Sequence, residues 1–140
     1  MANKFNKVVL SINAHPDDAE AWNAGVLKLL KDKGYKIVIA TMTGGDLGGC
    51  NMDMQETARV RFEEAKKAAA VLDAEYYTLG EVDGFLFDTK EMRLKTISLM
   101  RKVRAGIVFT HLPNDYHTDH RTTSNIVESA AMVASLDPVP

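Results

Sequence analysis

Short β-prone runs alternate with amphipathic segments along this chain. The runs are Val8–Ile12, Tyr35–Met42, Glu75–Leu79 and Ile107–Thr110, and each is followed by apolar residues at helical spacing. Because parallel strands need crossover connections, this alternation predicts a parallel sheet with helices on both faces. The expected fold class is a three-layer, Rossmann-like α/β fold with strand order 3-2-1-4.

The first two expected helices show the clearest apolar faces. The first helix begins at Asp17 or Asp18, ends at Gly34, and should turn one apolar stripe inward. This stripe consists of Trp22, Val26, Leu29 and Leu30. The second helix has the most regular spacing, and its inward face consists of Ala58, Phe62, Ala65, Ala69 and Leu72.

Two segments rich in His and Asp follow the first and fourth expected strands. They are Ala14–Glu20 and Pro113–His120. In the order 3-2-1-4 these two strands are neighbours where the winding direction reverses, and ligands bind beyond their carboxyl ends. We therefore expect the two segments to meet and to form one site.

The first segment has the spacing of a metal-binding turn. Pro16 favours an extended His15, and His15 and Asp18, three residues apart at a helix start, can point the same way. Asp17 lies between them and should project differently, as a general base acting on metal-bound water would. The alternative is that both Asp residues are helix caps and that His15 is a strand-end residue.

The second segment repeats this spacing, with His117 and His120 on either side of Asp119. A carboxylate beside an imidazole can orient its tautomer and favour its protonated form. The alternative is a polar loop and helix cap with solvated histidines. Because three of the chain's four histidines lie in two loops expected to meet, a shared metal site is the stronger hypothesis.

The spacing does not identify the metal. Two His and one Asp around an open position suit a catalytic Zn²⁺. The same donors form the facial triad of non-haem Fe²⁺ enzymes, so Fe²⁺ or another divalent metal stays open. Mg²⁺ fits less well because it prefers oxygen ligands.

Composition excludes several classes of protein. The chain is 46% hydrophobic and 26% charged, which is ordinary for one globular domain of 140 residues. A formal net charge of −2 without a basic cluster gives no general attraction for nucleic acid or anionic membrane. No apolar stretch approaches the roughly 20 residues of a membrane span. The single Cys50 excludes an internal disulfide, which fits a cytoplasmic protein.

Four motifs occur in order between residues 8 and 127, and together they resemble the PIG-L/LmbE family of zinc-dependent de-N-acetylases. The motifs are His15-Pro16-Asp17-Asp18, Gly45-Asp46-Leu47-Gly48-Gly49, Arg61 followed by Glu64, and Pro113-Asn114-Asp115-Tyr116-His117-Thr118-Asp119-His120. The resemblance implies a single domain over residues 1–140. Family members are usually longer, so we expect this chain to lack the family's C-terminal portion.

The resemblance also implies a role for each site residue. The family's zinc ligands correspond to His15, Asp18 and His120. Asp17 corresponds to the general base and His117 to the acid or oxyanion stabiliser, with Asp119 supporting that histidine. The implied reaction is hydrolysis of the acetamide of an N-acetylglucosamine-type sugar or its conjugate, which releases acetate and a free amine.

Other residues have weaker claims to the site. Arg61 resembles the family position that contacts substrate, and Asp46 and Asp83 lie in loops that could hydrogen-bond sugar hydroxyls. Tyr116 could cover the site or donate to an oxyanion. For these four the alternatives are a helix-surface charge, turn carboxylates and loop packing. His111 could face the pocket, but the simpler interpretation is a strand-end residue.

The implied partner is a small N-acetylated amino sugar, and homo-oligomerisation is left open. Two other functions stay open beside the de-N-acetylase: a non-catalytic sugar- or metal-binding remnant of the fold, and a metal-dependent phosphoesterase on the same scaffold. A pure binding module would not need both Asp17 and His117. Their presence therefore favours the enzyme.

Overall fold

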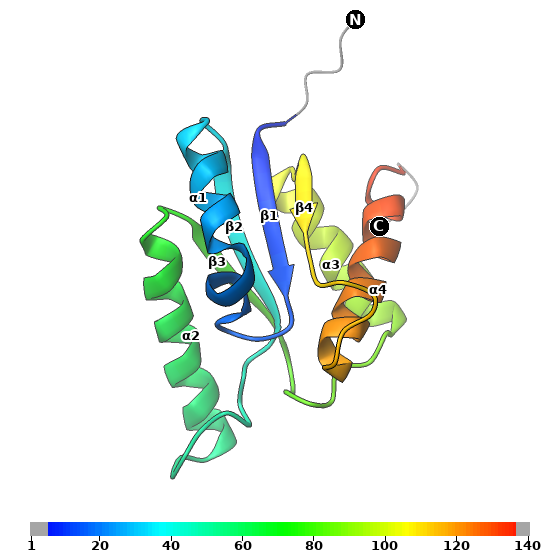
Figure 1. The fold of residues 1–140 in the computed structure, drawn as a ribbon. Helices are drawn as coiled ribbons and strands as arrows, with labels where there is room; N and C mark the ends of the chain where they lie inside the picture. The colour runs from blue at the N-terminus through cyan, green and yellow to red at the C-terminus, as the bar shows by residue number, and fades with distance from the viewer. Residues whose placement is uncertain (1–5, 137–140) are drawn as a thin grey trace, which may run out of the picture.

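The computed structural model describes residues 6–136, which form a four-stranded sheet. The strands are β1 (Val8–Asn13), β2 (Lys36–Thr43), β3 (Glu75–Glu81) and β4 (Ile107–Phe109). Their order is β3-β2-β1-β4, and all neighbouring pairs are parallel (Figure 1). The predicted fold class and strand order are therefore confirmed.

Helices cover both faces of this sheet. A short π-helical turn, η1 (Ala19–Asn23), leads into α1 (Ala24–Asp32), which shares one face with α2 (Met54–Ala70). The other face is covered by α3 (Lys90–Val103) and α4 (Thr118–Ala134) (Figure 1). Across residues 6–136, no helix combines the length and hydrophobicity needed to span a bilayer.

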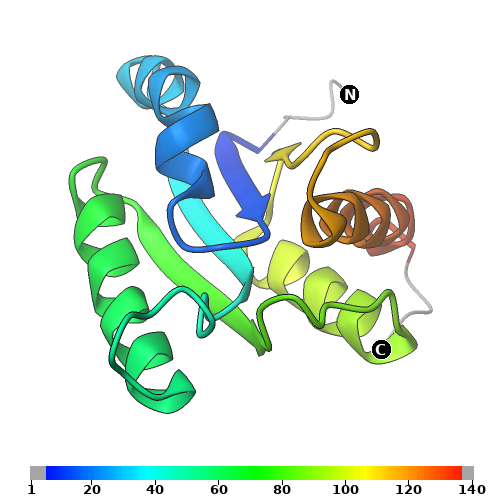
Figure 2. The same ribbon diagram turned by 60° about the horizontal axis from the view of Figure 1, so that its bottom comes forward.

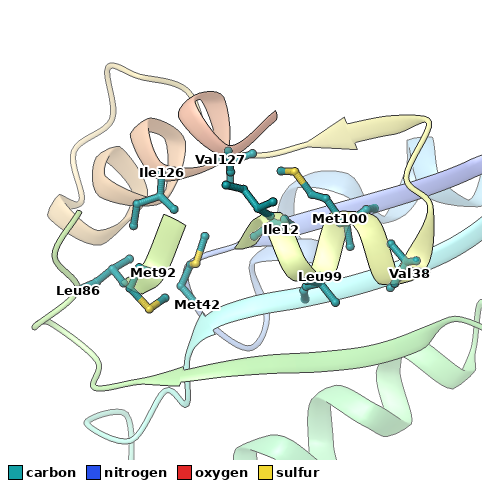
Figure 3. Close-up of a cluster of buried hydrophobic side chains, with 14 residues drawn as sticks. Ile12, Val38, Met42, Leu86, Met92, Leu99, Met100, Ile126 and Val127 are labelled. Carbon is teal, nitrogen blue, oxygen red and sulfur yellow. The ribbon is translucent and has the colours of Figure 1, made fainter. Parts of the chain in front are cut away.

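The core consists of two apolar clusters separated by the sheet. On the α3 and α4 side, Leu10 and Ile12 of β1 pack with residues of both helices, including Met100 and Ile126 (Figure 3). On the other side, Val9 packs in a smaller cluster with residues of β2, α1 and α2. Because β1 and β2 are buried on both faces, their sequences are nearly continuous apolar runs instead of alternating ones.

The inward face of the first helix differs from the predicted stripe. Trp22 is 67% exposed, Val26 38% and Leu29 62%, Leu30 is only partly buried, and the fully buried residue of α1 is Leu27. The prediction assumed a regular helix from Asp18 onward. The π-helical turn η1 contains more residues per turn than an α-helix, so it rotates the following residues relative to the core.

Parallel strands bring all their carboxyl ends to one edge of the sheet. The segments that follow β1 and β4 therefore start side by side, since β1 pairs directly with β4. Figure 2 views the molecule with this lower edge turned forward, where the loop after β1 lies centrally. The fold thus places the two His- and Asp-rich segments next to each other.

Candidate active site

All four histidines of the chain gather at the carboxyl ends of β1 and β4. The ring centroids of His15 and His117 are 4.7 Å apart, and those of His117 and His120 are 4.9 Å apart. His111 stacks on His120 with a centroid separation of 3.8 Å. The two segments therefore meet in space, as the pairing of β1 with β4 requires.

Asp18 lies at the centre of this cluster. Its Oδ2 accepts the backbone N–H of His15 at 2.8 Å and lies 3.4 Å from His15 Nδ1, while its Oδ1 lies 3.4 Å from His120 Nε2. Asp18 makes no side-chain capping hydrogen bond, so the helix-cap interpretation does not describe it. Burial would raise the pKa of this carboxyl, but the adjacent His111 and His15 side chains and the His15 backbone N–H hold it well below its usual range.

His15 is held between carboxylates. Its Nε2 lies 3.1 Å from Asp119 Oδ2 and 3.1 Å from Asp83 Oδ1. Burial lowers the pKa of His15, but hydrogen bonds with Asp18 and Asp119 and the nearby charges outweigh burial and raise the pKa to about 9. With Nε2 facing these two carboxylates, Nδ1 is the nitrogen that faces Asp18.

His120 is oriented in a corresponding way. Its Nδ1 lies 3.1 Å from Asp115 Oδ1, which leaves Nε2 facing Asp18. Burial lowers the pKa of His120, and this favours the neutral imidazole that binds metal. Histidines that bind metal typically have one ring nitrogen held by a carboxylate while the other faces the ion. His120 has this arrangement, with Asp115 at Nδ1 and Asp18 opposite Nε2.

His117 differs from the other two histidines in its hydrogen bonding. The backbone N–H of Asp119 donates to His117 Nδ1 at 3.1 Å, which assigns the ring proton of the neutral form to Nε2. His117 therefore offers an N–H to the cavity instead of a lone pair. Such a group can donate to an oxygen atom but cannot bind a metal in this tautomer.

The Asp119 carboxylate supports a different histidine from the one expected. Only the backbone amide of Asp119 reaches His117, while Oδ2 accepts the Gly84 N–H at 2.8 Å and contacts His15. The reason is the position of Asp119 in the first turn of α4, where amide and side chain point in different directions. Its Oδ1 is buried and has no hydrogen-bond partner within the described part of the chain.

The ligand atoms within residues 6–136 form three overlapping groups that could hold a metal ion. These are His15 with His117 and His120, Asp18 with His111 and His120, and His15 with Asp83 and Asp119. The three expected ligands are divided between the first two groups, which share His120. His15 Nδ1 and His120 Nε2 each lie 3.4 Å from an Asp18 carboxylate oxygen, and this set of nitrogen and oxygen donors suits a divalent cation.

Asp17 lies on the outer side of the cluster. Its φ of 115° is unusual for a residue with a side chain and stores strain of about 1–3 kcal/mol. Its carboxylate is 66% exposed and accepts a hydrogen bond from Arg61 Nη2 at 2.8 Å. Arg61 also donates to the Pro16 carbonyl, so one guanidinium fixes this turn from α2.

A cavity of about 250 Å³ opens in front of the histidines. Its lining includes Asp17, Arg61, Asp83, Tyr116 and the three histidines of the two motifs. Asp46 does not line it, because its Oδ1 accepts the Asp83 N–H at 2.9 Å and holds that loop. A separate apolar cavity of about 290 Å³ between α2 and β3 contains none of the histidines.

His111 is the site residue that the sequence interpretation missed. A single histidine at a strand end has no partner at a diagnostic spacing, so the residue pattern gave no reason to choose it. One signal was available in the composition: the chain has only four histidines, and three of them were already assigned to the site. The structure adds the fourth.

Comparisons with known proteins agree with this geometry. The family model of the GlcNAc-PI de-N-acetylases, PIG-L, matches residues 10–131. The chain therefore belongs to the PIG-L family. Diacetylchitobiose deacetylase of Thermococcus kodakarensis is 34% identical over 140 residues, which cover 94% of this chain and 52% of that protein.

Solved structures show the same relationship. N,N'-diacetylchitobiose deacetylase from Pyrococcus horikoshii, complexed with its inhibitor MPG, has a TM-score of 0.88 at 29% identity over 95% of this chain and 52% of its own. GalB, the 4-carboxy-2-hydroxymuconate hydratase from Pseudomonas putida KT2440, has a TM-score of 0.84 at 22% identity over 90% and 56%, which shows a shared fold alone. This chain thus spans about half the length of these relatives.

Proposed function

We propose that this protein is a zinc-dependent hydrolase that removes the acetyl group from an N-acetylglucosamine-type amino sugar or its conjugate. One observation carries the proposal: His15 and His120 each turn one nitrogen toward Asp18 while a carboxylate holds the other nitrogen. Membership of the PIG-L family and the deacetylase activity named for two relatives support this substrate class.

His15, Asp18 and His120 would hold the metal. Two imidazole nitrogens and one carboxylate oxygen suit Zn²⁺, and Fe²⁺ accepts the same donors. An ion bound there would polarise the acetamide carbonyl and lower the pKa of a water molecule.

Asp17 accepts the proton of the attacking water in this mechanism. Its carboxylate lines the same cavity as the histidines but does not share the buried position of Asp18. The positive φ of Asp17 separates the two neighbouring carboxylates, and Arg61 holds that of Asp17 on the cavity side. The Asp17 oxygen that Arg61 does not bond is then available for proton transfer, while Asp18 would bind the metal.

His117 stabilises the negative charge that develops on the substrate oxygen. Its Nε2–H is directed by the Asp119 amide at Nδ1, so this donor needs no rearrangement during the reaction. The proton that the departing amine needs then comes from Asp17, which took it from the attacking water. Asp119 acts on this step through its backbone, while its carboxylate acts on His15.

Arg61, Asp83 and Tyr116 would contact the sugar. All three line the cavity, and Tyr116 is 81% exposed at its rim, where it can cover a bound ring. Asp46 would not contact the sugar itself but would position Asp83, because its carboxylate accepts the Asp83 backbone N–H. The cavity volume of about 250 Å³ suits one sugar residue with the remainder of a conjugate outside.

Amine release together with bound metal tests this function. Zinc-loaded protein is incubated with N-acetylglucosamine, its oligomers and its glycosides, and free amine, acetate and metal content are measured. We expect amine and acetate in equal amounts, loss of both on chelation, and recovery with Zn²⁺. Stoichiometric zinc binding without cleavage of any acetamide would contradict the proposal, and a phosphate monoester supplied in parallel tests for phosphoesterase activity.

A further inference from the structure

His111 contacts both halves of the proposed metal site from the loop after β4. Its side chain is 6% exposed, and it reaches across to the end of β1. It belongs to neither of the two motif segments. Its contacts are nevertheless with Ala14, Asp18 and His120, which surround the proposed ligands.

The first contact fixes the backbone immediately before His15. The Ala14 N–H donates to His111 Nε2 at 3.0 Å. The Ala14 carbonyl accepts both the backbone N–H and the Oγ1 hydroxyl of Thr43, each at 2.9 Å. Because both polar groups of this buried residue are held, the direction in which the chain enters His15 is set.

The second contact fixes the ring of His120. The planes of His111 and His120 are inclined by 9°, and their centroids are 3.8 Å apart. The His120 side chain is 4% exposed, and Asp115 holds its Nδ1. Stacking on one side and a carboxylate at the ring edge leave Nε2 a single direction, toward Asp18.

The hydrogen bond from Ala14 also excludes His111 Nε2 as a metal ligand. A ring nitrogen of imidazole has one in-plane lone pair, and that of Nε2 is occupied by the Ala14 N–H. His111 Nε2 lies only 3.2 Å from Asp18 Oδ2, so it is close enough to be mistaken for a ligand atom. With its lone pair in use, it cannot bind the metal that Asp18 binds.

We propose that His111 is a positioning residue that sets the geometry of His15 and His120 for metal binding without being a ligand. This inference rests on the proposed function, because it assumes that these two residues bind metal. It adds a residue outside both motifs, and it predicts that two separable contacts of one side chain contribute to metal affinity.

Three substitutions separate the two contacts. His111→Gln keeps a hydrogen-bond acceptor for the Ala14 N–H but loses the ring. His111→Phe keeps a ring that can stack on His120 but loses the acceptor. His111→Ala removes both. Leu112→Ala is the matched control, since the neighbouring Leu112 is 71% exposed and makes no contact used by the site.

The measurements are the Zn²⁺ dissociation constant, by competition with a chromophoric chelator, and the visible spectrum of the Co²⁺ form. We expect His111→Ala to weaken Zn²⁺ binding about 10–100-fold, as loss of groups that orient metal ligands does. His111→Gln and His111→Phe should each restore part of this loss, and the Co²⁺ spectrum should keep its coordination number. Leu112→Ala should bind like the wild type.

Two results would overturn the positioning role. One is Zn²⁺ binding by His111→Ala equal to that of the wild type. The other is a Co²⁺ spectrum that loses a nitrogen ligand in all three variants, which would make His111 a ligand. Thermal unfolding with chelator present identifies any variant that fails to fold. The variants that do fold then decide whether His111 has the positioning role. A wild type that binds no metal would instead contradict the proposed function, so the two failures are distinguishable.

Discussion

The inner and outer sides of the site are built from adjacent residues but differ in environment. On the inner side, Asp18 is 6% exposed and Asp119 fully buried, and the carboxylates contact histidines or backbone amides. On the outer side, the Asp17 carboxylate and the Tyr116 ring are mostly exposed. The inner side is held by contacts within the protein, whereas the outer side is open to solvent.

The two sides meet at consecutive residues, Asp17 and Asp18. Asp17 and Asp18 have the same side chain, yet one contacts an arginine at the surface and the other contacts buried histidines. The backbone has a positive φ of 115° at Asp17, where this change of environment occurs. Residue type therefore does not distinguish the two carboxylates, whereas their burial and their contacts do.

The largest expected effect is on turnover, through the outer carboxylate. Asp17→Asn should lower kcat by about 10²–10⁴-fold, because the amide cannot accept the proton of the attacking water. Metal content should stay equal to that of the wild type. Steady-state amine release, normalised to bound zinc, measures the effect. Unchanged turnover in zinc-loaded Asp17→Asn would remove Asp17 from the mechanism.

The inner carboxylate should show the opposite pattern. Asp18→Asn should weaken Zn²⁺ binding by more than about 100-fold, since losing a ligand costs more than losing a group that orients one. Chelator competition measures this, with Asp17→Asn as the matched control at the neighbouring position. Equal metal affinities for the two variants would mean that the two sides do not differ in the way described.

Metal affinity should depend on pH through His15. Without metal, the carboxylates around His15 raise its pKa to about 9, so a proton occupies this residue at neutral pH. Binding must displace the proton, and the Zn²⁺ affinity should therefore rise about tenfold per pH unit from pH 6.5 to 9 and level off above. Competition titrations across this range provide the measurement. An affinity that is flat between pH 7 and 8.5 would show that metal binding displaces no proton from His15 in this range, which contradicts the raised pKa.

The smallest expected effect concerns the loop that supports Asp17. Gly45 has φ +65°, and a Cβ there would lie 2.9 Å from Pro16 Cδ, so Gly45→Ala should lower the free energy of unfolding by about 1–2 kcal/mol. Gly25→Ala is the matched control: nothing lies within 4 Å of its added Cβ, and α1 should gain about 0.5–1 kcal/mol. Urea unfolding measures both. A stabilised Gly45→Ala would contradict the strain at this contact.

The sequence was sufficient for the architecture because the relevant signals are local or topological. Strand and helix periodicity predicted the parallel sheet, and the winding rule placed β1 beside β4, where the two motif segments meet.

Three features could not be obtained from the sequence pattern. The π-helical turn before α1 rotates the buried face to Leu27, and no residue in that turn signals it. The partner of the Asp119 carboxylate depends on where Gly84 and His15 lie in space. His111 has no spacing partner, so only the three-dimensional contacts with Ala14 and His120 place it in the site.

The most direct test of the central claim is an anomalous difference map from crystals of the zinc-loaded protein. The account predicts one peak at the inner side, about 2.0–2.2 Å from His15 Nδ1, an Asp18 oxygen and His120 Nε2. His111 and His117 should lie outside the coordination sphere. A peak coordinated by His117, by His111, or by Asp83 and Asp119 in place of Asp18 would contradict the assignment of ligands on which the proposed mechanism rests.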